Sequence, residues 1–174
     1  GSEKSVVEHV YGKYPKYTSK SRLTNTPKQM SKPGIFSIGY EKKDIDLFLD
    51  LLIQNEVEML VDVRRNPFSM SSAYIGSRLE RALKNAGIDY LHVPELGIDG
   101  EYRKNLESDK DYEVLFSLYR REMLPKNEEK ARMVAKLGKE KRIALMCFEA
   151  DKCRCHRGVL AEKLEEWDMK VEHI

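Results

Sequence analysis

Short apolar runs alternate with stretches that are apolar on one helical face, from residue 35 to the end of the chain. The short runs predict strands, and apolar residues spaced three and four apart predict helices. The predicted strands are 35–38, 59–63, 89–93, 142–147 and 170–174. The predicted helices are 45–53, 79–86, 112–119, 127–137 and 157–167. This alternation indicates an α/β fold, with an open, mostly parallel sheet of about five strands and helices on both faces.

Particular residues mark the ends of several predicted helices. Asp44 precedes the first helix and can accept hydrogen bonds from its free N–H groups. Gly87 and Gly138 follow the second and fourth helices, and glycine is common just beyond a helix end. Pro125 is expected to end or kink the third helix, because proline cannot donate the backbone hydrogen bond that a helix interior requires.

Size and composition favour a single cytoplasmic domain. A chain of 174 residues is long enough to bury one core. It is 41% hydrophobic and 34% charged, and it contains no apolar run near the roughly 18 residues of a membrane span. No signal-peptide pattern stands at the start. Three cysteines are an odd number, which fits reduced thiols in a cytosol rather than a disulfide framework.

The first 34 residues form a basic tail that precedes the predicted domain at 35–174. They hold seven basic and two acidic residues, a net charge of +5, so the rest of the chain carries −3. Three tyrosines lie among the lysines, a mixture used by segments that bind single-stranded nucleic acid. The same composition is typical of a disordered leader, and both interpretations stay open.

The most polar segments follow the predicted strands, at 39–40, 62–69, 94–97 and 147–157. Ligands of open parallel sheets bind beyond these carboxyl ends of the strands. Asp62, Arg64 and Arg65 place charges directly after an apolar strand. They either contact a ligand or form an Asp62–Arg64 or Asp62–Arg65 ion pair that merely closes the loop.

The segment CFEADKCRCHR, residues 147–157, suggests thiol or metal chemistry. A phosphatase-like loop needs five residues between cysteine and arginine, but Cys153 stands where that arginine would be. Cys147, at the end of a strand, is expected to be a small core residue. A zinc site would require the side chains of Cys155 and His156 to bind the same ion. Because these residues are adjacent, their side chains are expected to converge on one tetrahedral ion only with difficulty. We therefore expect no metal and no cofactor.

The start of the last predicted helix favours an anion. Free N–H groups and the helix dipole attract negative charge near Cys155, His156 and Arg157. Glu149 lies just beyond the strand and could act as a base, orient a water or bind a sugar hydroxyl. The alternative is that Glu149 and Arg157 simply pair, while His156 caps the helix.

Five motifs read IFSIGY, LVDVRRNPFS, YLHVPELG, EYRKNL and MCFEADKCRCHRGVLAEKL. In this order they resemble domain-of-unknown-function family 488, over about residues 35–174. Two departures are Leu96-Gly97-Ile98-Asp99, where members commonly have Leu-Gly-Gly or Leu-Gly-Thr-Pro, and Cys153, which replaces a residue that is usually not cysteine. The resemblance brings no established reaction, but it implies signature positions at Asp62, Arg64, Pro67, Ser69, Glu95, Gly97, Arg103, Cys147, Glu149, Cys155, His156 and Arg157.

Signature positions that follow strand ends are typical of a site rather than a core. We expect Asp62, Arg64, Glu95, Glu149, His156 and Arg157 to meet in one cleft of mixed charge. The predicted catalytic residues are Glu149, Asp62, His156 and Glu95. The predicted ligand-binding residues are Tyr40, Arg64, Ser69, Gly97, Arg103, Cys155 and Arg157.

Arginines suit a phosphate, and carboxylates suit hydroxyl groups, amines or water. We therefore expect a phosphate-bearing small molecule or a nucleic acid as partner. The expected reaction is cleavage or transfer at a glycosidic or phosphoester bond of a nucleotide, nucleoside or nucleic acid. Two alternatives remain, a non-catalytic nucleic-acid-binding module and a thiol-dependent enzyme that uses Cys155. The sequence does not indicate an oligomeric state.

Overall fold

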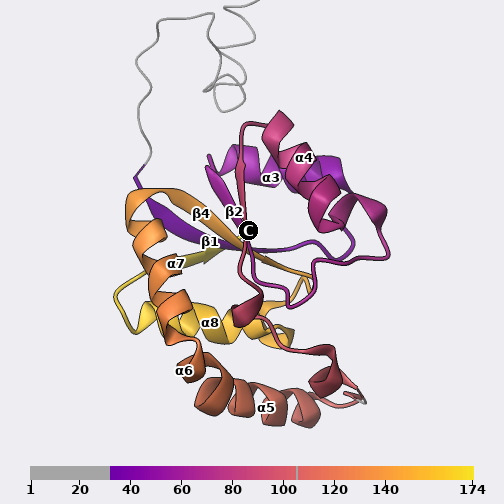
Figure 1. The fold of residues 1–174 in the computed structure, drawn as a ribbon, viewed down its shortest axis with the longest axis vertical. Coiled ribbons are helices and arrows are strands. Elements are labelled where there is room, and N and C mark those ends of the chain that lie inside the picture. The colour runs from indigo at the N-terminus through magenta and orange to yellow at the C-terminus, as the bar shows by residue number, and fades with distance from the viewer. Residues whose placement is uncertain (1–31, 105) are drawn as a thin grey trace, which may run out of the picture.

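The computed structural model describes residues 32–104 and 106–174, which build a five-stranded parallel sheet (Figure 1). The strands are β1 (Gly34–Gly39), β2 (Met59–Asp62), β3 (Asp89–His92), β4 (Arg142–Cys147) and β5 (Val171–His173). They lie in the order β3-β2-β4-β1-β5, and neighbouring strands run parallel. The predicted α/β fold is confirmed.

Helices cover both faces of this sheet, as predicted. The α-helices are α3 (Ile45–Gln54), α4 (Gly76–Asn85), α5 (Asp109–Leu118), α6 (Leu124–Lys126), α7 (Glu128–Glu140) and α8 (His156–Glu165). The described residues also form four short 3-10 turns, η1 (Ser72–Tyr74), η2 (Pro94–Leu96), η3 (Gly100–Arg103) and η5 (Lys152–Arg154), and one π-helical turn, η4 (Tyr119–Met123). Helices α3 and α4 pack on one face, and α5 to α8 pack on the other (Figure 1).

The central strand β4 shows why both faces need a cover. Its side chains alternate between the two cores: Ile143 and Leu145 pack with α7 and α8, whereas Ala144 and Met146 pack with α3 and α4. All four residues are fully buried. A strand that is apolar on both sides is stable only between two layers of helices, which accounts for its continuous apolar run.

The helix ends predicted at Asp44 and Gly87 are confirmed. Asp44 is the N-cap of α3, and its side chain accepts a hydrogen bond from the backbone N–H of Leu47 at 2.8 Å. Gly87 has φ of 69° directly after the last turn of α4, the left-handed conformation that favours glycine.

The helix end predicted at Gly138 is wrong. Gly138 lies inside α7 rather than beyond its end, and an added Cβ there would overlap the side chain of Ile35 on β1. The glycine therefore lets α7 approach the sheet closely. The helical segment that begins with α5 ends at Pro125 as expected, because the π-helical turn η4 continues α5 and α6 stops at Lys126, one residue after the proline.

The strand register brings three loops to the same edge of the sheet. Gly39 at the end of β1 is paired with Cys147 at the end of β4, and Asp62 at the end of β2 is paired with Met146. The segments that follow these strands therefore start side by side. This edge is where the sequence predicts a site.

Gly39 is the point where β1 meets the loop after β4. An added Cβ would overlap the carbonyl oxygen of Glu149, so we expect Gly39→Ala to lower the free energy of unfolding by about 1–3 kcal/mol. Gly34→Ala is the matched control in the same strand, since its added Cβ would have no atom within 4 Å. Urea denaturation of both variants measures the difference, and equal midpoints would contradict the predicted overlap.

The predicted basic tail lies outside the described residues, apart from its last three positions. Within the described part of the chain, no helix has both the length and the apolar content to cross a membrane.

Candidate functional site

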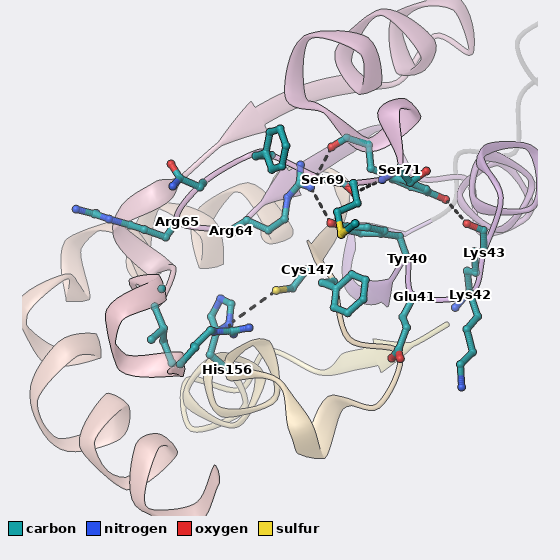
Figure 2. A pocket seen from close by; sticks show the side chains of 18 residues that line it. Tyr40, Glu41, Lys42, Lys43, Arg64, Arg65, Ser69, Ser71, Cys147 and His156 are labelled. Carbon is teal, nitrogen blue, oxygen red and sulfur yellow. Dashed lines mark hydrogen bonds between the residues drawn. The ribbon is translucent and has the colours of Figure 1, made fainter. Parts of the chain in front are cut away.

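A cavity of about 580 Å³ opens at the carboxyl edge of the sheet (Figure 2). Its walls come from the segments after β1, β2 and β4, together with η1 and η3. Five of the predicted site residues line it, namely Tyr40, Arg64, Ser69, Arg103 and His156. The structure therefore brings residues from four separate sequence motifs to one hollow.

Four more predicted residues lie behind this lining. Asp62, Cys155 and Arg157 are buried, and Glu149 is nearly so, with a side chain 15% exposed. Each contacts a lining residue or the backbone of the loop after β4, as described below.

Glu95 and Gly97 do not join the others in one cleft. They line a separate hollow, where Glu95 forms a partly exposed ion pair with Lys130 at 3.1 Å. Gly97 has a packing role instead, because an added Cβ would overlap the backbone of Arg65. Glycine therefore allows the segment before η3 to lie directly against the loop after β2.

Asp62 and Arg64 form the ion pair that the sequence allowed as an alternative to ligand binding. Arg64 donates to both carboxylate oxygens, from Nε at 2.9 and 3.2 Å and from Nη2 at 2.6 Å. Its Nη1 donates to Tyr40 Oη and to the carbonyl of Tyr74, while Tyr90 Oη donates to Asp62. Burial alone would lower the pKa of Arg64, but the hydrogen bonds and charge of Asp62 raise it above its usual value. This network closes the floor of the cavity.

Glu149 pairs with Arg103 rather than with Arg157. Arg103 Nη1 donates to Glu149 Oε1 at 2.5 Å. Burial would raise the pKa of Glu149, but the charge of Arg103 and several hydrogen bonds outweigh it and lower the pKa. Glu149 is therefore an ionised carboxylate at neutral pH, directly behind the cavity wall.

The contacts of His156 assign different hydrogen-bond roles to its two ring nitrogens. His156 is the first residue of α8 and does not cap the helix with its side chain. Its Nε2 lies 3.0 Å from the carbonyl oxygen of Val63, which can only accept, so Nε2 carries the proton. Arg103 Nη2, which can only donate, lies 3.1 Å from Nδ1, so Nδ1 accepts through its lone pair.

Arg157 holds the loop after β4 in place. Its side chain is buried, with Nε donating to Ser37 Oγ at 2.9 Å on β1. The two terminal nitrogens donate to the backbone carbonyls of Glu149 and Ala150. These donors face acceptors inside the protein, and Arg157 is not among the described residues that line the cavity. The anion-binding role predicted for it has no direct contact to support it.

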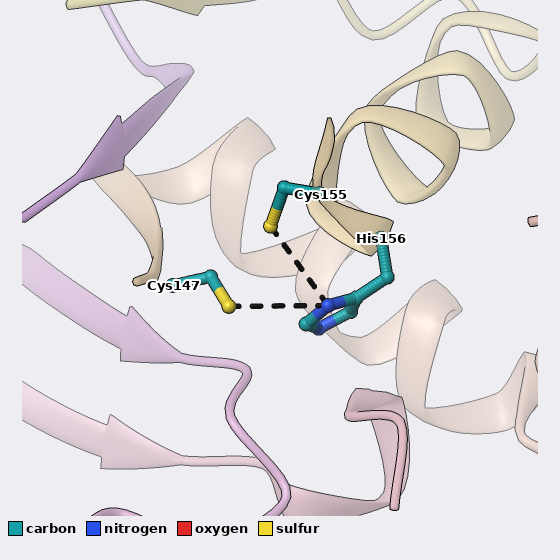
Figure 3. Close-up of side chains that lie close together, drawn as sticks. All are labelled: Cys147, Cys155 and His156. Atoms are coloured by element: carbon teal, nitrogen blue, oxygen red, sulfur yellow. Dashed lines mark hydrogen bonds between the residues drawn. The ribbon is translucent and has the colours of Figure 1, made fainter. Parts of the chain in front are cut away.

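Cys147, Cys155 and His156 converge at the inner wall of the cavity (Figure 3). The Sγ atoms of Cys147 and Cys155 lie 3.9 and 3.8 Å from His156 Nδ1, and all three atoms are within 4.8 Å of one another. The expectation that adjacency prevents Cys155 and His156 from converging is wrong. Cys155 has an extended backbone just before α8, with φ of −134° and ψ of 138°, which lets both side chains face inward.

Cys155 is a poor candidate for a nucleophile. It is fully buried, and burial followed by its contact with Cys147 raises the pKa of its thiol well above the usual value. A neutral thiol without access to the cavity does not support the thiol-enzyme alternative.

A family model described as "Domain of unknown function DUF488" matches residues 44–164, more than half of the chain. The chain belongs to this family. The match confirms the resemblance seen in the sequence motifs, and it contains every predicted site residue except Tyr40. No curated protein and no solved structure matches the chain.

The cavity of this DUF488 protein also has lining residues that the sequence reasoning missed. Lys42, Lys43, Tyr74 and Phe148 line it, and Tyr40 stacks on Tyr74 with ring centroids 4.2 Å apart. The adjacent lysines just after the first strand end were a usable signal. Tyr74 gave none, because it reaches the cavity from a 3-10 turn that no periodicity predicts.

Proposed function

We propose that the cavity binds the phosphate and base of a nucleotide, either free or within a nucleic acid strand. The observation that carries this proposal is the lining itself, which combines five cationic side chains, one carboxylate and four aromatic rings. A hollow of about 580 Å³ is also in the size range of small-molecule sites.

Some of these cations are free to meet a phosphate. Arg64 and Arg103 are already paired with carboxylates. Lys42 is exposed and has no hydrogen-bond or ion-pair partner among the described residues. Arg65 has a half-exposed side chain and a loose ion pair with Asp99 at 3.9 Å. Lys42 and Arg65 are therefore the proposed phosphate contacts.

Exposed aromatic side chains on the same lining suit a base. Phe68 is 70% exposed and Phe148 is 46% exposed, which is unusual for large apolar side chains. Aromatic rings beside cationic side chains are the combination by which proteins bind single-stranded nucleic acid. A base stacked on Phe68 or Phe148 would cover apolar surface that is now in water.

The carboxylate of Glu149 supports a reaction at this site. It touches Arg103 and Cys147, two lining residues, and its lowered pKa keeps it ionised. Glycosidic hydrolysis usually needs two carboxylates, whereas Asp62 is held by Arg64 and Glu95 lies elsewhere. Attack of water on a phosphoester bond, with Glu149 as general base, therefore fits better than glycosidic cleavage.

Binding of mononucleotides and short single-stranded oligonucleotides to the full chain tests the proposal. Lys42→Ala and Arg65→Ala should each weaken binding about tenfold to 100-fold, because each removes a charge-assisted hydrogen bond. Lys139→Ala is the control, since it removes an exposed lysine near the end of α7, which leads to the opposite edge of the sheet. Equal affinities for all three variants, or no nucleotide binding by the wild type, would reject the site.

A further inference from the structure

Beyond the proposed function, the structure places two thiols and an imidazole nitrogen around one point at the cavity wall (Figure 3). We infer that Cys147, Cys155 and His156 form a Zn²⁺ site with three protein ligands and a fourth position that faces the cavity.

The spacing of the three ligand atoms fits tetrahedral zinc. Zn–S bonds of about 2.3 Å and a Zn–N bond of about 2.05 Å separate sulfur and nitrogen by about 3.6 Å. The two S···N distances are 3.8 and 3.9 Å, so shifts of a few tenths of an ångström create the site. Side-chain rotation alone can supply such shifts.

The tautomer of His156 is the one that a metal requires. Histidine ligands almost always donate their other ring N–H to a carbonyl or carboxylate, which fixes the ring. His156 does so through Nε2 to the carbonyl of Val63 at 3.0 Å, and this leaves the lone pair of Nδ1 facing the two thiols. The orienting contact is thus already present.

The surrounding charges balance a divalent ion. Two thiolates with the Glu149 carboxylate carry −3, while Zn²⁺ and the Arg103 guanidinium carry +3. Arg103 Nη2 lies 3.1 Å from Nδ1, where the ion would bind, so this nitrogen must move. The Arg103 side chain is 29% exposed and lines the cavity, which gives it room to move while its other nitrogen remains paired with Glu149.

An ion can reach the proposed zinc site from the cavity, and the fourth coordination position is left without a protein ligand. Cys147 and His156 both line the cavity, so an ion in the cavity meets two ligands before it reaches the buried Cys155. Zinc sites with three protein ligands keep a water in the fourth position and lower its pKa. Glu149 Oε2 lies 3.3 Å from Cys147 Sγ, so its carboxylate accepts a hydrogen bond from one of the ligand atoms.

Cobalt titration of the full chain under reducing conditions tests the site without any assay of activity. Co²⁺ at one equivalent should give a thiolate-to-metal charge-transfer band with the visible absorption of tetrahedral cobalt, and Zn²⁺ should abolish both. Cys153→Ser should leave the spectrum unchanged, because Cys153 is exposed and outside the cluster. Cys147→Ser and Cys155→Ser should each reduce the band and weaken binding by at least about 100-fold.

Proton release provides a second measurement that does not depend on the variants folding. Both thiols must lose a proton on binding, so calorimetry in buffers of different ionisation enthalpy should find about two protons released per ion. Below the thiol pKa values, the apparent affinity should then fall about 100-fold for each unit of pH. A folded wild-type chain without the charge-transfer band, or an equal loss in Cys153→Ser, would overturn the inference.

Discussion

Replacing Asp62 with alanine is expected to lower the free energy of unfolding by about 3–5 kcal/mol, because it leaves a buried arginine without its partner. Arg64 is 5% exposed, and three of its contacts are to the two oxygens of this carboxylate. Tyr90 would also lose the acceptor of its hydroxyl group. A loss of this size is a large share of the roughly 5–15 kcal/mol that stabilises a typical domain.

Asp99→Ala is the matched control for this prediction. Its ion pair with Arg65 is exposed and loose, and its side chain accepts one exposed hydrogen bond from the N–H of Glu101, so its loss should change the free energy of unfolding by no more than about 2 kcal/mol. Replacing both buried partners, as in Asp62→Leu with Arg64→Met, should cost less than Asp62→Ala alone, because no charge is then stranded. Urea denaturation measures the free energy of unfolding of all three variants. A value for Asp62→Ala close to that of the wild type would contradict the buried network.

Glu149→Gln is expected to reduce turnover of the proposed nucleotide substrate by about 10²–10⁴-fold, while affinity for it stays nearly the same. Glutamine keeps the size of the side chain and can still contact Arg103, but it cannot accept the proton of an attacking water. Single-turnover rates and binding constants, measured on the same protein, separate the two effects. Unchanged turnover in the variant, or binding without turnover in the wild type, would favour the non-catalytic binding module.

The acid dependence of stability gives an independent check on Glu149. Its pKa is lower in the folded protein than the value of about 4.3 in an unfolded chain. The carboxylate therefore contributes stability above the unfolded pKa, and this contribution is lost as pH falls through the folded value. Glu149→Gln should remove this part of the acid dependence, whereas it should persist in Asp99→Ala.

The fold was predictable because it follows from the pattern of apolar residues within short segments of the sequence. A run such as Ile143–Met146, apolar at every position, fits a strand buried on both faces, and the alternation with helices then selects a parallel sheet. Gly138 was misread for the opposite reason. A glycine can end a helix or let it approach a neighbour, and here the neighbour is Ile35, which is distant in the sequence.

The location of the candidate site was predictable from the sequence, but the roles of its individual side chains were less so. Strand ends placed Arg64 and Arg157 correctly at one edge of the sheet, yet the sequence cannot tell whether an arginine faces a ligand or the interior. That choice depends on distant acceptors, such as Ser37 for Arg157. The convergence of Cys155 with His156 depends on one extended residue before α8, which no spacing rule reveals.

The strand order also governs when the cavity can form during synthesis of the chain. β1 and β2 are the first two strands of the described residues, but β4 separates them in the sheet. A nascent chain on the ribosome therefore has two unjoined sheet fragments until residue 147 has emerged, and joining them is a late, long-range step. Arg64 and Cys147 become neighbours only then. A partly made chain therefore lacks the assembled cavity, whose walls come from segments after β1, β2 and β4.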